Sequence, residues 1–256
     1  MPGNIGNLGG FAIQKPGNRS QKFNQLIYGE SGVGKTRLSG SADDVPEMRK
    51  VLVMDVEGGT ETLRHTYGDV DVVRVKTWKE VQRLYDTLYV DLHGYTTIVI
   101  DSLTELQKFS MSQIMVDIVL AAEQKGETRD ADIPSIREWG KNIEQIRRFT
   151  RAFRDLECNC IFTALVREDK DPMKGIIKKR PYLSGKLASE VAAFMDIVSF
   201  MYMREIPDPE DDNKMKPHRL LCSVATEDVT AKDRYNRLPQ VMIDPVMKDI
   251  FAAVSV

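Results

Sequence analysis

Residues 29–36 constrain this chain more than any other segment, because they read G-E-S-G-V-G-K-T. This spacing fits the pattern G-x-x-x-x-G-K-[ST], in which a glycine-rich loop turns backbone N–H groups toward phosphate oxygens. The apolar residues 23–28 before the loop are typical of a buried strand, and residues 36–39 can begin a helix. A strand, the loop and a helix in this order predict a phosphate-binding site.

The chemistry of the loop predicts how each residue contributes. We expect Lys35 to reach the β- and γ-phosphates of a nucleotide and the hydroxyl of Thr36 to bind Mg²⁺, so ATP and Mg²⁺ are the expected ligands. The predicted nucleotide-binding residues are Gly29, Glu30, Ser31, Gly32, Val33, Gly34, Lys35 and Thr36.

Acidic residues that follow two later apolar runs complete the predicted site. Asp101 closes the run 97–100 and is expected to hold Mg²⁺ together with Thr36. Asp55 and Glu57 end the run that starts at residue 51, and we expect Glu57 to be the base that activates the attacking water. The alternative is a carboxylate pair that binds metal or solvates a loop.

Apolar and amphipathic segments alternate along the chain, which predicts an α/β fold with a mostly parallel sheet flanked by helices. We expect one domain over residues 21–256, preceded by an arm over residues 1–20 that is rich in Gly, Asn and Pro. The arm either docks on its own core or inserts into a neighbouring subunit. Further strands are predicted at 51–55, 70–75, 97–101 and 160–166, helices at 78–89, 136–156 and 245–253, and a C-terminal hairpin from strands 197–204 and 219–226.

Composition excludes several classes of protein. The net charge of −2 gives no overall attraction to nucleic acid, so any such contact depends on local basic patches. Three cysteines are too few for a disulfide framework, and Cys158 and Cys160 are expected to be strand residues. Without an apolar run of about 18 residues, we expect a reducing, cytoplasmic location.

The order of these motifs resembles a known family. The loop, then Asp55-Val56-Glu57-Gly58-Gly59, then Ile98-Val99-Ile100-Asp101-Ser102-Leu103, is similar to the RecA/RadA-like core ATPases over residues 23–244. The likeness is greatest to the phage RecA-fold single-strand annealing (Sak-type) proteins.

The resemblance implies a RecA-like core, with Glu57 as the catalytic base of an ATPase. It also implies binding of single-stranded DNA and annealing or strand pairing in phage-type recombination, in the host cytoplasm. A single-strand-binding protein is a candidate partner.

One position departs from the family. By alignment Leu165 lies where RecA has the glutamine that senses the γ-phosphate, and a leucine side chain cannot form that hydrogen bond. Thr163 is the nearest polar substitute, and the coupling of ATP to DNA is expected to differ.

Two segments predict contacts beyond the single subunit. Lys232 and Arg234 resemble the Lys-x-Arg segment that RadA-like ATPases point into a neighbour's site, which would require a ring or filament; the alternative is a solvated basic turn. Residues 167–180 hold six basic and three acidic side chains, a net +3, and correspond to the DNA-contacting loop of the family. The predicted DNA-binding residues are Lys174, Lys178, Lys179 and Arg180, with Tyr182 as a stacking face; the alternative is a surface loop.

Two other functional classes remain open on the sequence. The first is a small-molecule P-loop kinase, for which the arginines between residues 147 and 154 would have to form a lid. The second is a nucleotide-gated oligomeric switch or loader that does not act on DNA.

Overall fold

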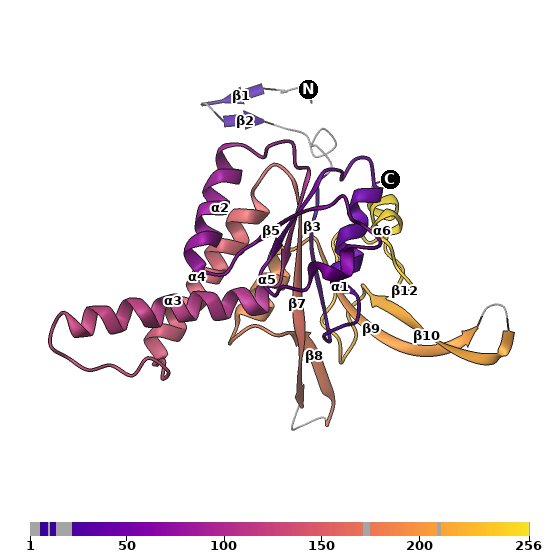
Figure 1. The fold of residues 1–256 in the computed structure, drawn as a ribbon. Coiled ribbons are helices and arrows are strands. Elements are labelled where there is room, and N and C mark those ends of the chain that lie inside the picture. The colour runs from indigo at the N-terminus through magenta and orange to yellow at the C-terminus, as the bar shows by residue number, and fades with distance from the viewer. Residues whose placement is uncertain (1–5, 10, 14–21, 171–174, 209–210, 256) are drawn as a thin grey trace.

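The computed structural model describes residues 6–9, 11–13, 22–170, 175–208 and 211–255, and its centre is one large β-sheet (Figure 1). The strands are β1 (Gly6–Leu8), β2 (Phe11–Ile13), β3 (Asn24–Gly29), β4 (Val51–Asp55), β5 (Asp71–Arg74), β6 (Thr97–Asp101), β7 (Asn159–Lys170), β8 (Ile177–Pro181), β9 (Ile197–Asp208), β10 (Asp211–Cys222), β11 (Lys232–Asp233) and β12 (Val241–Ile243).

The order of strands in the ten-stranded sheet is β12-β10-β9-β3-β7-β6-β4-β5, with β8 paired to β7 and β11 to β9. The neighbours from β9 to β5 are all parallel, whereas β8, β10, β11 and β12 pair antiparallel. Because parallel strands end at the same edge, the carboxyl ends of β3, β4 and β6 lie together.

Helices cover both faces of this sheet. They are α1 (Lys35–Gly40), α2 (Trp78–Val90), α3 (Leu103–Glu123), α4 (Ile136–Arg154), α5 (Leu187–Phe194) and α6 (Met247–Val254), with short 3₁₀ helices at Ser41–Asp44 and Thr60–Leu63. Helices α2 to α5 pack on one face, and α1 and α6 on the other (Figure 1). The predicted α/β fold, with its mostly parallel sheet and its C-terminal antiparallel hairpin, is confirmed.

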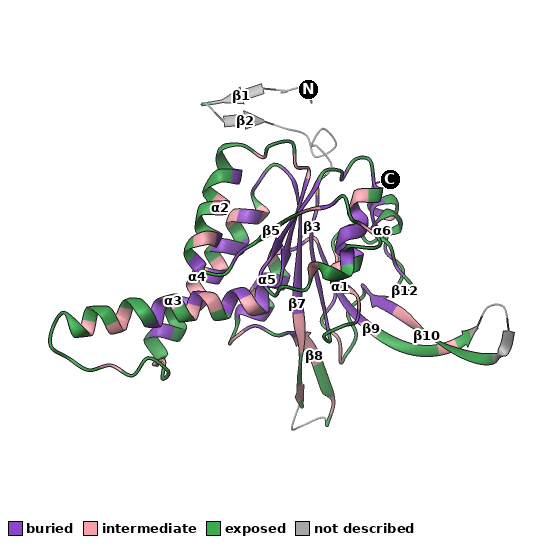
Figure 2. Cartoon of the chain, in the orientation of Figure 1, coloured by how far each residue is buried: buried purple, intermediate pink, exposed green. Residues whose placement is uncertain are grey.

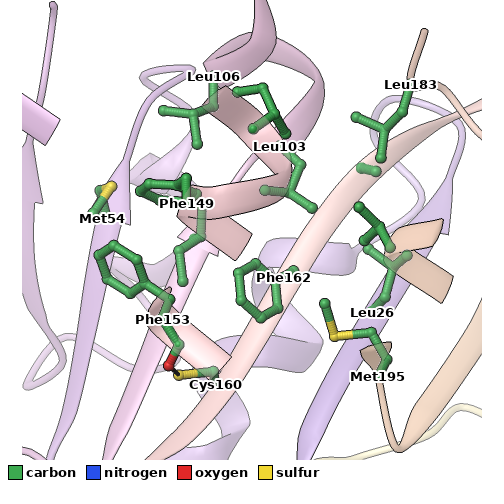
Figure 3. Packing of buried hydrophobic residues seen from close by; sticks show 14 of the residues in the cluster. Leu26, Met54, Leu103, Leu106, Phe149, Phe153, Cys160, Phe162, Leu183 and Met195 are labelled. Atoms are coloured by element: carbon green, nitrogen blue, oxygen red, sulfur yellow. Dashed lines mark hydrogen bonds between the residues drawn. The ribbon is translucent and has the colours of Figure 1, made fainter. Parts of the chain in front are cut away.

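The central strands are apolar on both sides, which is why they are buried between two helical layers. In β3, Leu26 and Tyr28 face the α2–α5 side, while Ile27 faces the α1 and α6 side. The larger cluster packs Phe162 of β7 among side chains of α3, α4 and β3 (Figure 3). Cys160 donates a hydrogen bond from its thiol to the Phe153 carbonyl, at 3.0 Å, and is a strand residue as predicted. The same prediction is wrong for Cys158, which lies just before β7.

The segment expected to be a flexible loop after residue 166 is instead a β-hairpin in its described part. Strand β7 continues to Lys170, and β8 pairs with it in the register Asp169 opposite Lys178 and Glu168 opposite Lys179. These two opposite-charge pairs stabilise the hairpin, although Arg167 faces Arg180, and the composition of the segment does not reveal which charges face each other. Lys174 lies outside the described residues.

The C-terminal hairpin is longer than expected. Strands β9 and β10 pair from Phe200 and Cys222 out to Asp208 and Asp211, so they take in most of the acidic segment assigned to a loop. Their outer halves project from the body and are largely exposed where described (Figure 2).

At the N-terminus, β1 and β2 pair with each other and not with the central sheet. This pairing lies within residues 1–20, and the boundary at residue 21 stays a prediction. Within the described ranges, no helix is both long and apolar enough to cross a bilayer.

Candidate functional site at the carboxyl ends of the parallel strands

The loop between β3 and α1 has the backbone shape that a phosphate-binding loop requires. Gly32 and Gly34 have φ values of +77° and +106°, in the left-handed region that glycine tolerates. Gly29 lies against β9, and a Cβ atom there would come within 2.2 Å of the Met201 carbonyl oxygen. The glycines of the motif therefore serve both the turn and its packing on the sheet.

Lys35 is buried at the first residue of α1 and points back across the loop. Its Nζ donates hydrogen bonds to the carbonyls of Gly29 at 3.1 Å and Glu30 at 2.7 Å. Burial lowers the pKa of Lys35, while the charges of Asp101, Glu57 and Glu30 oppose that shift. A phosphate beside this ammonium would further favour its charged form, so Lys35 fits its predicted role.

Asp101 at the end of β6 is the hub of the polar cluster. Its Oδ2 accepts a hydrogen bond from Thr36 Oγ1 at 2.6 Å, and its Oδ1 accepts one from the buried hydroxyl of Thr163. A hydroxyl and a carboxylate side by side are the hard oxygen donors that Mg²⁺ takes beside nucleotide phosphates. Thr36 and Asp101 therefore fit the expected metal.

Asp55 and Glu57 have different partners, which separates their roles. Asp55 is buried, and it accepts hydrogen bonds from Gly58 N at 2.6 Å and Thr60 Oγ1 at 2.9 Å. It also forms an ion pair with Arg74 at 3.0 Å. Asp55 thus fixes the turn after β4.

Glu57 is exposed on that turn, and its Oε1 accepts a hydrogen bond from the hydroxyl of Ser102. Two further backbone hydrogen bonds join the turn to β6, from Val56 N and Glu57 N to the Asp101 carbonyl, at 2.8 and 3.3 Å. The predicted base therefore lies beside the predicted metal ligand.

The position aligned with the RecA glutamine is apolar here. Leu165 contributes its backbone N–H to Thr104 Oγ1 at 3.0 Å. The nearest polar side chain on the same strand, Thr163, is committed to Asp101. The side-chain contact between β7 and the polar cluster is therefore the hydrogen bond from Thr163 to Asp101.

Arg219 is a site residue that the sequence did not reveal. It lies on β10, and its Nε donates a hydrogen bond to the Val33 carbonyl of the loop at 3.2 Å. The two residues are 186 positions apart, so no local pattern could connect them.

Lys232 and Arg234 lie away from the loop of their own chain. Strand β11 pairs with the first residues of β9, next to the start of β3, whereas the loop follows the end of β3. Lys232 Nζ donates to the carbonyls of Ala193 at 3.0 Å and Met195 at 2.6 Å. Arg234 pairs with Asp196 at 2.6 Å, and a role in a neighbour's site stays a prediction.

The basic residues of β8 do not form one row. Successive side chains of a strand point to opposite faces, so Lys178 and Arg180 share one face and Lys179 the other. Arg180 forms an ion pair with Asp169, and Lys179 Nζ lies 5.6 Å from the centre of the Phe200 ring.

The arginines of α4 are engaged on the surface of the helix layer. Arg147 pairs with Glu144 and Glu190, and Arg151 lies over the Phe194 ring at 4.4 Å. These local contacts agree with a solvated face and give no support to a kinase lid.

The family was decided by comparison with known domains, which matched residues 21–235 to a family described as AAA domain. The chain belongs to that AAA domain family. It is a P-loop NTPase domain, as the loop and its acidic partners predict. A search of curated proteins gave no match.

Two solved structures are similar in fold. An ATPase of the type III secretion system of pathogenic bacteria is 16% identical, with a TM-score of 0.43 over 70% of this chain and 52% of that one. The assembled ATPase EscN of enteropathogenic E. coli is 17% identical, with a TM-score of 0.44 over 70% of this chain and 43% of that one. This AAA domain thus spans about half the length of those ATPases, and the likeness carries no functional information.

Thr163→Val should raise the Mg²⁺ concentration needed for half-maximal ATP turnover by at least about tenfold, because the loss of a hydrogen bond to a charged group costs about 1.5–3 kcal/mol. Thr97→Val is the matched control, since its buried hydroxyl donates to the Met48 carbonyl at the other end of β6. A Mg²⁺ titration of phosphate release measures both variants. Equal shifts in the two would contradict the role given to Thr163.

Proposed function

We propose that this AAA domain is a Mg²⁺-dependent ATPase that assembles into an oligomer, binds single-stranded DNA and promotes annealing or strand pairing in phage-type recombination. The observation that carries the ATPase part is the convergence of four predicted side chains at one edge of the sheet. Lys35, Thr36, Asp101 and Glu57 come from three separate elements. Thr36 and Glu57 are hydrogen-bonded to Asp101, and the charges of Asp101 and Glu57 act on the pKa of Lys35.

In the proposed reaction each side chain has a separate role. The loop and Lys35 hold the phosphates, and Thr36 and Asp101 hold Mg²⁺, which when bound offsets the negative charge of the phosphates. Ser102 orients Glu57, whose carboxylate takes the proton of the water that attacks the γ-phosphorus. The bond from that phosphorus to the bridging oxygen breaks, and ADP and phosphate leave.

Glu57→Gln should reduce ATP turnover by at least about a hundredfold, because general-base catalysis contributes roughly 10²–10⁴-fold. Affinity for ATP should stay within about threefold, since the amide keeps the shape of the side chain. Phosphate release and calorimetric titration with ATP measure the two quantities. Glu61→Gln on the following 3₁₀ helix is the control. Turnover that survives in the Glu57 variant would remove Glu57 as the base.

An oligomer is proposed because α3 and α4, which pack on each other, carry exposed apolar side chains. Helix α3 projects beyond the body (Figure 2). Val116 and Leu120 of α3 are 50% and 52% exposed, and Ile136, the first residue of α4, is 90% exposed. Exposed apolar side chains on neighbouring helices suit an interaction surface. A head-to-tail assembly would bring one subunit's Lys232 and Arg234 toward the next subunit's loop.

The role of Arg234 in trans predicts complementation between two inactive variants. Arg234→Ala should lower turnover by on the order of 10³-fold while subunits still bind ATP, because an arginine at the γ-phosphate stabilises the transition-state charge. Mixing it with Glu57→Gln should restore part of the activity, since some sites then combine an intact base with an intact arginine.

Arg237→Ala is the control for Arg234, because it is an exposed arginine of the same segment. Arg234→Ala also removes the ion pair between Arg234 and Asp196. The melting temperatures of the variant and the wild type show whether turnover falls because the fold is destabilised or because catalysis is lost. If two folded variants recover no turnover when mixed, or if Arg234→Ala stays fully active, the proposed role is wrong.

DNA binding is assigned to the hairpin of β7 and β8. Strand β7 carries Thr163 inside the sheet and then leaves it to pair with the basic strand β8. Strand β7 touches the Asp101 cluster through Thr163, and further along it pairs with β8, which carries Lys178 and Arg180; this offers a direct physical link between nucleotide and DNA. Tyr182, 47% exposed after β8, adds a face on which a base can stack.

Binding to single-stranded DNA should weaken with the logarithm of salt concentration, with a slope of about −0.7 for each phosphate neutralised. Lys178→Ala should make that slope shallower by about 0.7, whereas Lys248→Ala on α6 should leave it unchanged. Shift assays with labelled DNA, with and without Mg²⁺ and ATP, measure it. A flat salt response, or equal slopes for the three proteins, would favour the nucleotide-gated switch that does not act on DNA.

A further inference from the structure

The order of strands in the sheet determines on which side of the loop each end of a bound nucleotide lies. Asp101 and Glu57 belong to β6 and to the turn after β4, which lie on the β7 side of β3. Because the γ-phosphate must lie near these carboxylates, the nucleoside must leave the loop on the opposite side. That side is formed by β9, β10 and β12.

Two cavities adjoin the loop there, on opposite faces of the sheet. The larger, of 610 Å³, meets the loop at residues 30–33 and includes Phe200 and Cys222 of the α2–α5 face. The smaller, of 380 Å³, meets it at Gly34 and Arg37 and includes Leu38 of the α1 face. Both volumes suit a small ligand.

The smaller cavity continues directly from the phosphate-binding backbone. Gly34 and Arg37 of its wall flank Lys35 and Thr36, so a phosphate chain held by these two residues ends at its mouth. A Cβ atom at Gly34 would lie 2.7 Å from Arg219 Nε, so the glycine leaves room for this guanidinium beside the loop. The charged side chains of the wall are Arg37, Lys216, Arg219 and Asp244. With three cationic side chains and one carboxylate, this wall has a net positive charge, which favours the part of a nucleotide where the sugar joins the phosphates.

The rest of the cavity offers flat and polar surfaces. Tyr67 packs against α1, where a Cβ atom on Gly40 would lie 3.3 Å from its ring, and Pro245 lines the cavity as well. Asp244 Oδ1 accepts a hydrogen bond from Arg219 N at 3.0 Å, and its Oδ2 lies 2.5 Å from His218 Nδ1. His218 Nε2 is buried and has no hydrogen-bond partner among the described residues. This wall therefore holds its polar groups in fixed positions next to an aromatic ring.

We propose that the cavity between α1, Tyr67 and β10 binds the nucleobase and ribose of ATP, with Tyr67 as the stacking face and Arg219 next to the sugar and α-phosphate. The inference rests on the proposed function, since it names where the rest of the same nucleotide lies. It also places the base on the α1 face of the sheet, away from the β7–β8 hairpin and the larger cavity.

The experiment compares two ligands that share three phosphates, ATP and inorganic tripolyphosphate, both titrated calorimetrically with Mg²⁺. Tyr67→Ala should weaken ATP binding by about tenfold, because stacking of a base on an aromatic ring contributes that much or more. Tripolyphosphate, which has no base, should bind within about twofold of wild type. Tyr67→Phe should behave as wild type with both ligands.

Tyr202→Ala is the matched control, because Tyr202 lines the larger cavity, where it stacks on Phe200. It should leave the ratio of the two affinities unchanged. A selective loss of ATP binding in Tyr202→Ala would place the base in the larger cavity and overturn the inference. So would a Tyr67→Ala variant in which ATP binding falls no more than tripolyphosphate binding. A wild-type protein that binds neither ligand would instead refute the proposed function.

Discussion

The hydrogen bonds around Asp101 are the interactions on which the rest of the site depends. Its carboxylate joins Thr36 of the phosphate loop to Thr163 of β7, and its carbonyl accepts from Val56 N and Glu57 N after β4. One residue thus sets the positions of the loop, the neighbouring strand and the turn that carries the predicted base. The parallel register makes this possible, since it ends β3, β4 and β6 at a single edge.

The parts of the site that the sequence predicted are those with a local signal. The loop has a fixed spacing, and Asp101 and Glu57 follow apolar runs that could only be buried strands. The contacts of Arg219 and Thr163 depend on which strands lie side by side. A short stretch of sequence does not show that pairing, because the partners are 186 and 62 positions apart. Ser102 could be placed after Asp101, but its hydrogen bond to Glu57 required the pairing of β4 with β6.

Charge patterns were the least informative part of the sequence. Residues 167–180 have the composition of a loop, yet their described part is a hairpin in which Glu168 and Asp169 of β7 face Lys179 and Lys178 of β8. Lys232 and Arg234 form a short basic string whose neighbours in space, the end of α5 and Asp196, lie far away in sequence. The hairpin depends on residues of the facing strand, and Lys232 and Arg234 depend on residues at the end of a helix. The amino-acid composition of a segment does not show which distant residues it contacts.

A crystal structure with Mg²⁺ and a non-hydrolysable ATP analogue is the most direct test of the central claim, that the Asp101 cluster and the loop form one site for a nucleotide with its metal. In that structure we expect Lys35 Nζ to exchange the Gly29 and Glu30 carbonyls for phosphate oxygens at about 2.7–2.9 Å. We also expect Mg²⁺ at Thr36 Oγ1 with Asp101 beside it. Phosphates bound elsewhere, or a metal held away from Thr36 and Asp101, would contradict the claim.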